Sequence, residues 1–264
     1  MVALTKRITA LKQNAGHYLV RSLAVIVLLL VWHFLVIKNT NWPLQFGNLP
    51  QPIDVLTVWY QKLFEAAYYR DIAASTLRVL AGVVLGIVSG VPLGLWIGLS
   101  RTKISEALFT NLELFRPIPL IAYLPIAMIL FSTIESSIIF ITFIGAFFPI
   151  FINTMDAVKR VPSSFVDVSK CLGCGPIRSI WRIYLPAVLP QMFTGLSVGI
   201  GASWMGVITA EMMSGQKGIG YATWYAYNLM DYNLSIIGMF TIGILGFTSV
   251  VLIRSIERYI IKWK

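Results

Sequence analysis

The sequence predicts an all-α membrane protein with about six transmembrane helices, and three observations support this fold class. Hydrophobic residues make up 57% of the chain and charged residues only 12%, with a mean hydropathy of +0.78, which excludes a soluble globular domain. Apolar runs of about 20 residues, long enough to cross the hydrocarbon layer, recur along the chain. The basic residues stand mostly at the ends of these runs. We therefore expect a single transmembrane domain over residues 1–264.

The predicted spans cover residues 19–37, 76–99, 104–131, 137–157, 187–212 and 235–256. If the N-terminus is inside, fifteen Lys and Arg residues fall in the inner loops and tails, whereas only Lys38, Lys62, Arg70 and Lys217 fall outside. Positive residues favour the cytoplasmic side, so both termini are predicted to be cytoplasmic. Because the basic residues do not gather in one stripe, the net charge of +10 does not favour nucleic-acid binding.

Residues 1–70 are predicted to hold the first span and an outer amphipathic segment. The span follows Lys6, Arg7 and Lys12, as in a signal peptide, but no small-residue cleavage site follows it, so an uncleaved span is favoured. Residues 54–69 are predicted to form a helix along the outer surface, with an apolar side made of Val55, Trp59, Leu63 and Ala66.

The second span carries glycine at every fourth position. Residues four apart lie on one face of a helix, and a face of small residues lets two helices approach closely in lipid. The stripe predicts a packing seam, within the subunit or between two copies, rather than a ligand site. Its members are Gly82, Gly86, Gly90, Gly94 and Gly98.

The third span is interrupted by Arg116-Pro117-Ile118-Pro119. Prolines break the helical hydrogen-bond ladder, which is tolerated at membrane depth only where the backbone faces protein or a water-lined cavity. Arg116 is expected to avoid lipid, and two interpretations are open. It pairs with Glu113 on the same face and holds the helix in the bundle, or it gives a transport path positive charge for an anion.

The fifth span ends near Glu211, and the glycines at 215, 218 and 220 predict a tight or re-entrant outer loop. Glu211 is expected to cap or pair locally, and Trp204 to pack in mid-span, on a helix expected to line the path. The candidate path residues are therefore Arg116, Pro117, Pro119, Trp204 and Glu211.

One long polar segment, residues 161–186, interrupts the second half of the chain. It contains Lys170, Arg178 and Arg182, so it is predicted to be cytoplasmic. Pro162 can open a short helix, Gly173 permits a reversal, and a second short helix leads to Leu185-Pro186. The first helix carries an apolar stripe of Phe165, Val168 and Leu172. A one-faced helix that stands off the membrane is suited to contact a soluble partner.

This segment resembles the EAA signature of ABC-importer permeases, E-A-A-x3-G-x9-I-x-L-P. Gly173, Ile183, Leu185 and Pro186 match at each spacing, whereas Glu-Ala-Ala is replaced by Asp167, Val168 and Ser169. From about residue 75 to residue 257 the chain is similar to permeases of the nitrate, taurine/sulfonate and bicarbonate importer group. The similarity is carried by stretches such as Arg116-Pro117-Ile118-Pro119, Leu185-Pro186 and Ala210-Glu211-Met212.

The resemblance implies the type I ABC importer permease fold, with a permease core at residues 71–260 and a cytoplasmic coupling loop at 161–186. It implies a second, usually identical, permease copy, two cytoplasmic ATPase subunits and an external substrate-binding protein, in a bacterial cytoplasmic (inner) membrane. The ATPase-coupling residues that it implies are Ser163, Phe165, Asp167, Val168, Ser169, Leu172, Gly173, Ile183, Leu185 and Pro186. The substrate stays open among nitrate, taurine or aliphatic sulfonates, and bicarbonate.

Catalytic motifs are absent from the sequence: there is no Walker P-loop, no nucleophile elbow and no H-E-x-x-H. We therefore expect no enzyme activity and no cofactor, with ATP hydrolysed by a partner. Cys171 and Cys174 form C-x-x-C, but His17 and His33 lie far away in sequence, so no metal site is expected and His33 has no assigned role. A stand-alone secondary transporter is the alternative; it would need coupling-ion sites, and the spans lack the repeated carboxylates of a proton relay.

Overall fold

The computed structural model describes residues 20, 23–24, 26–38, 46–100, 102–171 and 173–262. Every regular element in these ranges is a helix, which confirms the all-α class. The elements are a 3-10 helix Phe46–Asn48, α2 Pro52–Lys62, α3 Ala66–Leu99, α4 Lys103–Phe115, α5 Leu120–Leu130, α6 Ile134–Lys159, α7 Ser163–Cys171, α8 Pro176–Ser179, a π-helix Ile180–Tyr184, α9 Leu185–Ser214, α10 Ile219–Asn228 and α11 Tyr232–Ile260.

Four helical stretches in the described ranges are long and apolar enough to cross a membrane: α3, α6, α11 and the continuous stretch Pro176–Ser214 that ends in α9. A fifth crossing arises if α4 and α5, which are bent by 102° at their junction, count as one broken span. The predicted first span lies partly outside the described residues, and its described part is the shorter apolar helix Ile26–Ile37. Four of the six predicted spans therefore correspond to helices of sufficient length within the described residues, and a fifth does so if the bent pair α4 and α5 counts as one span.

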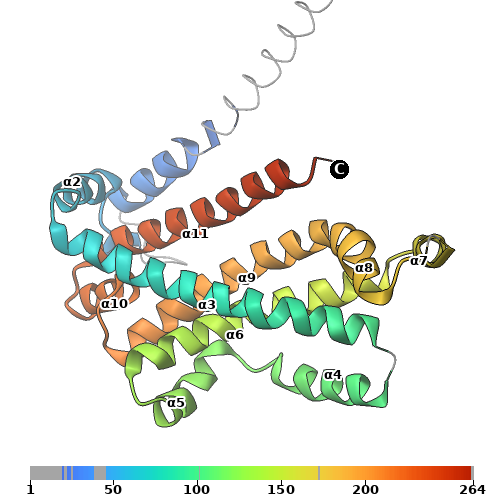
Figure 1. The fold of residues 1–264 in the computed structure, drawn as a ribbon. Helices are drawn as coiled ribbons and strands as arrows, with labels where there is room; N and C mark the ends of the chain where they lie inside the picture. The colour runs from blue at the N-terminus through green and yellow to red at the C-terminus, as the bar shows by residue number, and fades with distance from the viewer. Residues whose placement is uncertain are drawn as a thin grey trace, which may run out of the picture.

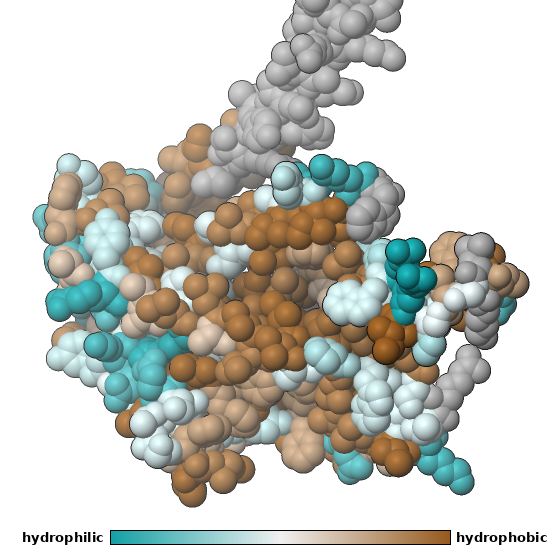
Figure 2. Space-filling model, viewed as in Figure 1, coloured by the Kyte–Doolittle hydropathy of each residue, from teal (hydrophilic) through white to brown (hydrophobic). Residues whose placement is uncertain are grey.

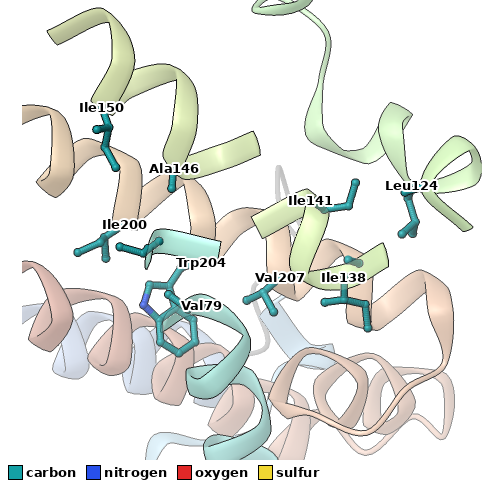
Figure 3. Close-up of a cluster of buried hydrophobic side chains, with 12 residues drawn as sticks. Val79, Leu124, Ile138, Ile141, Ala146, Ile150, Ile200, Trp204 and Val207 are labelled. Carbon is teal, nitrogen blue, oxygen red and sulfur yellow. The ribbon is translucent and has the colours of Figure 1, made fainter. Parts of the chain in front are cut away.

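The three helices α3, α6 and α9 run side by side through the middle of the molecule (Figure 1). Helix α6 packs against both neighbours, and its inner face supplies much of the core. Figure 3 shows the buried cluster to which α6 contributes Ile141 and Ile150, α3 contributes Val79, and α9 contributes Ile200 and Val207. Helices α2 and α10 lie at one end of this bundle, and α7 and α8 lie at the opposite end (Figure 1).

Large apolar side chains cover much of the surface between these two ends, where brown residues dominate Figure 2. On α11, for example, Ile244 is 53% exposed and Phe247 is 71% exposed. Exposed apolar area on this scale is unusual for a protein surrounded by water, whereas it is the expected surface of a helix that faces lipid.

The five glycines of the predicted seam lie on α3 against α6 of the same chain. A Cβ added to Gly82 would come within 2.6 Å of the Cβ of Thr142, and one added to Gly94 within 2.7 Å of the carbonyl oxygen of Phe151. Gly86, Gly90 and Gly98 face Ala146, Phe147 and Val158 in the same way. The stripe therefore lets two helix backbones of one subunit approach closely. The sequence left open a seam within the subunit or one between two copies, and the structure shows the seam within the subunit.

Two boundaries at the α10 end differ from the sequence-based prediction. The predicted helix 54–69 ends at Lys62, and α3 already begins at Ala66, because Glu65 adopts an extended conformation between them. Helix α2 packs on α11 rather than lying free on the surface: Val55 is buried and Trp59 stacks on Phe240. Hydropathy reports which part of a helix suits lipid, not where the helix starts, and so the start of the second span was predicted ten residues late.

The predicted outer loop after residue 212 also contains a helix. Gly215 ends α9 in the left-handed conformation (φ 68°), as glycine commonly does after a helix, and Gly218 has φ 152°. The chain then forms α10 over residues 219–228 before α11 begins. The tight turn was therefore predicted correctly, while the helix that follows it was not.

Candidate functional site

The 161–186 segment projects from one end of the bundle as α7, a turn, and α8 (Figure 1). Phe165 and Val168 of the predicted apolar stripe are 55% and 58% exposed, and Leu172 lies outside the described residues. Ile177 and Trp181, which follow the turn, are 72% and 66% exposed. Four large apolar side chains are thus uncovered on an element that sits at the end of the molecule rather than along its apolar flank.

Hydrogen bonds hold the turn between α7 and α8. Gly173 has φ 68°, and the backbone N–H of Cys174 donates to the carbonyl oxygen of Ser169 (3.0 Å), closing the chain around the glycine. The hydroxyl groups of Ser169 and Ser179, both buried, lie 2.8 Å apart and join α7 to α8. Hydrogen bonds therefore join the two short helices into one unit.

The other side of α7 faces the bundle across a cavity of about 540 Å³. Ser163 and Asp167 line this cavity on α7, and Glu106, Lys159 and Tyr184 line it on the neighbouring elements. Four of the candidate coupling residues on α7 therefore fall into two groups: Phe165 and Val168 are exposed, whereas Ser163 and Asp167 border the cavity between α7 and the bundle.

The sequence predicted a second short helix that is separate from the fifth span. In the structure the two are continuous. Residues 176–179 form one turn of α8, residues 180–184 continue as a π-helix, and α9 begins at Leu185. Ile183 lies in the π-helix, and Pro186 lies in the first turn of α9. The backbone N–H of Leu185 donates to the carbonyl oxygen of Ile180, so the π-helix continues into α9 and residues 176–214 form one continuous helical stretch.

The broken span forms a pocket with α6 and α9. Pro119 precedes the first residue of α5, and the helices α4 and α5 meet at 102°. Arg116 and Ile118 of the break line a cavity of about 280 Å³, together with Phe148 and Asn153 of α6 and Val198 of α9. Its walls are mainly apolar, with Arg116 as the charged group and Asn153 as the uncharged polar side chain among the residues that line it.

Arg116 is only loosely paired in this pocket. Its Nη1 lies 3.6 Å from Oε1 of Glu113, and the two side chains are 55% and 48% exposed. Exposed ion pairs of this kind stabilise a protein by about 0–1 kcal/mol, so the contact with Glu113 does not fix the guanidinium group in place. The amide of Asn153 is engaged, since it donates to the carbonyl of Pro149 (2.8 Å) and accepts from Gln191 (2.9 Å). Arg116 therefore remains available to a ligand or to a partner.

Trp204 and Glu211, the other two charged or aromatic path candidates, do not line this pocket. Trp204 is 4% exposed in the core, where its Nε1 donates to Ser249 of α11 (3.2 Å). Glu211 is fully buried, and its charged partner is not local: Nη1 of Arg78, 133 residues away in sequence, donates to its Oε1 at 2.6 Å. The carboxylate also accepts a hydrogen bond from the backbone N–H of Gly220, in the first turn of α10 (2.9 Å), so the expected local cap is present, but the counter-charge comes from a distant residue.

The sequence did contain a signal for this ion pair. Arg78 and Glu211 are opposite charges inside two apolar spans, and a charge at such a position must be neutralised by a partner. Reading each span separately hid the pair, because no local spacing relates the two residues.

No group of three or more His, Cys, Asp or Glu side chains with metal-binding geometry occurs among the residues that the structure describes. Cys171 is exposed and Cys174 is half-buried, and neither forms a disulfide. The Nδ1 atom of His33 is buried and has no hydrogen-bond partner in the described part of the chain.

Comparison with known proteins gives a consistent result over most of the chain. Residues 90–263 match the family model described as "binding-protein-dependent transport system inner membrane component". A protein of Methanocaldococcus jannaschii that is described as an ABC transporter permease is 34% identical over 98% of this chain and 97% of its own length. The nitrate import permease of Synechocystis sp. is 34% identical over 85% of this chain and 82% of its own. The taurine transport permease of Escherichia coli is 29% identical over 90% of this chain and 86% of its own length.

The fold is also found among solved structures. A chain of the methionine ABC transporter MetNI, in an inward-facing conformation, superposes with a TM-score of 0.56 over 74% of this chain and 95% of its own, at 20% identity. At this identity the match supports the type I ABC importer permease fold and says nothing of the substrate.

Proposed function

This chain belongs to the binding-protein-dependent transport system inner membrane components, and from that premise we propose that it is the membrane-spanning subunit of an ATP-driven importer for a small anion. A permease component of the ABC-importer type has no nucleotide site of its own, so the energy must come from a partner. We propose that two cytoplasmic ATPase subunits bind a pair of these permeases, and that an external binding protein delivers the substrate.

One observation carries this proposal: the α7–α8 unit presents uncovered apolar side chains at one end of the bundle and is joined through a π-helix to a spanning helix. In water such side chains favour burial against a partner by about 25 cal/mol per Å². An ATPase docked on Phe165 and Val168 would therefore be mechanically connected to α9. The residues that match the family motif, Gly173, Ile183, Leu185 and Pro186, lie at the turn and along this connection.

The mechanism follows from this connection. Closure of the ATPase pair on ATP would move the 163–182 element as a rigid lever. The broken span, α6 and α9 of the two copies would then tilt and open the path towards the side that receives substrate, and hydrolysis would return it inward. In this arrangement the α7 end is cytoplasmic, with both termini, and the protein is a multi-pass component of a bacterial inner membrane surrounded by lipid.

The named relatives support an anion as cargo, since permeases for nitrate, taurine and bicarbonate are among them. The pocket at the broken span adds a physical reason: its charged lining residue is the loosely paired Arg116. Because Glu113 pairs only loosely with this guanidinium group, its positive charge can attract an anion that enters the pocket. We propose that Arg116, with Pro117 and Pro119 shaping the break, contributes to the translocation path.

The docking step can be tested directly by co-expressing this permease with a candidate ABC-type ATPase subunit. Phe165→Asp combined with Val168→Asp should abolish co-purification of the ATPase, because a hydrophobic contact is replaced by two charges, while membrane insertion is unchanged. Co-purification should be measured in detergent, with Ile244→Asn on the lipid-facing surface of α11 as the control. An ATPase that still binds the double variant would contradict the proposed docking surface.

The role of Arg116 is tested by uptake. Arg116→Gln is expected to lower the uptake of nitrate, taurine or bicarbonate, whichever the reconstituted wild-type system carries, by about tenfold, as for a lost charge contact of roughly 1.4 kcal/mol. ATP hydrolysis stimulated by the binding protein should persist, because the coupling end is intact. Glu113→Gln alone is the control. If the double variant with Glu113→Gln regains uptake, the two residues form a structural pair, and unchanged uptake by Arg116→Gln would reject the electrostatic role.

The energy source distinguishes the proposed ATP-driven importer from the alternative, a stand-alone secondary transporter. Uptake into vesicles that contain the permease without an ATPase, driven by a proton or sodium gradient, would favour that alternative. The proposed function requires that such vesicles take up none of the three anions until ATPase, ATP and binding protein are supplied.

A further inference from the structure

Arg78 connects three spanning helices at the α10 end of the bundle. Its Nε and Nη2 atoms donate to the two carboxylate oxygens of Glu135 (2.7 and 2.6 Å), in the first turn of α6. Its Nη1 donates to Oε1 of Glu211 on α9 (2.6 Å) and to the carbonyl oxygen of Lys217 in the following loop (2.7 Å). Arg78 itself lies on α3 and is 3% exposed. One side chain thus links α3, α6, α9 and the loop; we call this arrangement the Arg78 clasp.

The loop after α9 closes on the buried carboxylate of Glu211. Besides Arg78, this carboxylate accepts hydrogen bonds from the hydroxyl of Ser75 (2.8 and 3.0 Å) and from the backbone N–H of Gly220 (2.9 Å). The same hydroxyl accepts from the backbone N–H of Ile219 (3.0 Å). At Gly218, with φ 152°, a Cβ would collide with the carboxylate. The backbone can approach this closely only because glycine is present, so residues 215–220 are held against α3 as well as α9.

The two carboxylate arms of the clasp differ in their surroundings. The side chain of Glu211 is fully buried, whereas that of Glu135 is 52% exposed. Removing Glu211 would leave a buried arginine without its fully buried counter-charge, which threatens the fold itself. Removing the charge of Glu135 leaves the buried Arg78–Glu211 pair in place and breaks the link that runs from the start of α6, through Arg78, to Glu211 and the carbonyl oxygen of Lys217. The structure therefore offers a way to open the clasp without unfolding the bundle.

We propose that Arg78 is a positioning residue of the transport cycle: it fastens the ends of α3, α6 and α9 and residues 215–220 into one rigid body, so that motion begun at α7 and α8 reaches the α10 end. This inference rests on the proposed function, because it takes the driving motion from an ATPase docked at the opposite end of the bundle (Figure 1). The glycine seam joins α3 to α6 along their length, and the clasp completes the connection at the far end and extends it to α9.

The test compares how the two ends of the bundle respond to nucleotide. Amide hydrogen exchange is measured on the permease assembled with its ATPase in lipid vesicles, with and without ATP and vanadate, over residues 163–184 and 211–222. In the wild type both segments should change their exchange. In Glu135→Gln and in Arg78→Lys, residues 163–184 should respond as before, while the response of residues 211–222 falls by about fivefold, the lower end of typical coupling between two sites.

The two variants should behave alike, because a lysine can keep the contact with Glu211 but cannot also hold both oxygens of Glu135. Arg70→Gln, which removes an exposed charge from the same helix two turns earlier, is the control and should respond as the wild type. If Arg78→Lys does not assemble, Glu135→Gln alone decides the outcome, since its side chain is half exposed.

Three results are distinguishable. A loss of response confined to residues 211–222 supports the positioning role. Lower thermal stability with an undiminished response at both ends would overturn it and make the clasp a purely structural feature. If neither residues 163–184 nor residues 211–222 of the wild-type complex respond to nucleotide, the proposed function is contradicted. The inference about Arg78 would then fall with it.

Discussion

Gly94→Leu is expected to destabilise the folded permease. A Cβ at this position would lie 2.7 Å from the carbonyl oxygen of Phe151 and 2.9 Å from the Cβ of Thr154, so α3 and α6 would have to separate. Inserting atoms into a packed interior destabilises by about 1–3 kcal/mol, and contact with backbone rather than with a movable side chain places this change at the upper end. The loss should appear as a lower yield of folded protein and a lower midpoint of thermal unfolding in detergent.

The matched control for this change is Gly243→Leu. Gly243 also lies in the middle of a spanning helix, α11, but it is exposed and has no atom within 4 Å of an added Cβ. The same increase in side-chain volume there should be tolerated. Equal loss of folded protein in both variants would mean that the seam on α3 has no special packing role, and that leucine in place of glycine is harmful wherever it occurs in these helices.

Gly173→Val is expected to uncouple ATP hydrolysis from uptake. A Cβ would meet nothing within 4 Å, so the change creates no clash, but a β-branched residue strongly resists φ 68°. Such strain costs on the order of 1–3 kcal/mol, which the chain can relieve by opening the turn between α7 and α8. Membrane insertion should be normal, while the amount of substrate transported per ATP hydrolysed should fall by about tenfold, the equivalent of 1.4 kcal/mol.

Gly175→Val supplies a control two residues away in the same turn. Gly175 also has open space around an added Cβ, but its φ is −67°, which valine adopts without strain. Coupling should therefore be retained in Gly175→Val. Normal coupling of ATP hydrolysis to uptake in Gly173→Val, or an equal loss of coupling in both variants, would show that the conformation of Gly173 does not matter to the α7–α8 unit.

The sequence predicted the parts of this fold that depend on local pattern. Apolar runs located α3, α6, α9 and α11, and the prolines located the break between α4 and α5, because lipid imposes a length and a composition on each crossing. The glycine stripe identified a close-packing face. Periodicity tells which face of a helix packs but not against which neighbour, and so the choice of α6 as the partner came only from the structure.

The parts that the sequence missed depend on contacts between distant residues. Glu211 was expected to pair locally, yet its counter-charge comes from Arg78 in another span. Helix α10 and the early start of α3 at Ala66 escaped prediction because polar and aromatic residues mask helices that lie outside the apolar windows. The candidate coupling residues were found because the family motif is a local spacing, whereas the pocket around Arg116 needed three elements to be placed together.

The π-helix at residues 180–184 gives the coupling spacing an angular meaning. Each residue of an α-helix turns the chain by about 100°, and a π-helix amounts to one residue more than an α-helix would use over the same rise. The number of residues between Gly173 and Leu185 thus sets the angular position of Phe165 and Val168 around the axis of α9. It also sets their distance from that helix. A chain one residue shorter here would keep every side chain of the proposed docking surface but would rotate this surface by about a quarter-turn, away from the proposed ATPase partner.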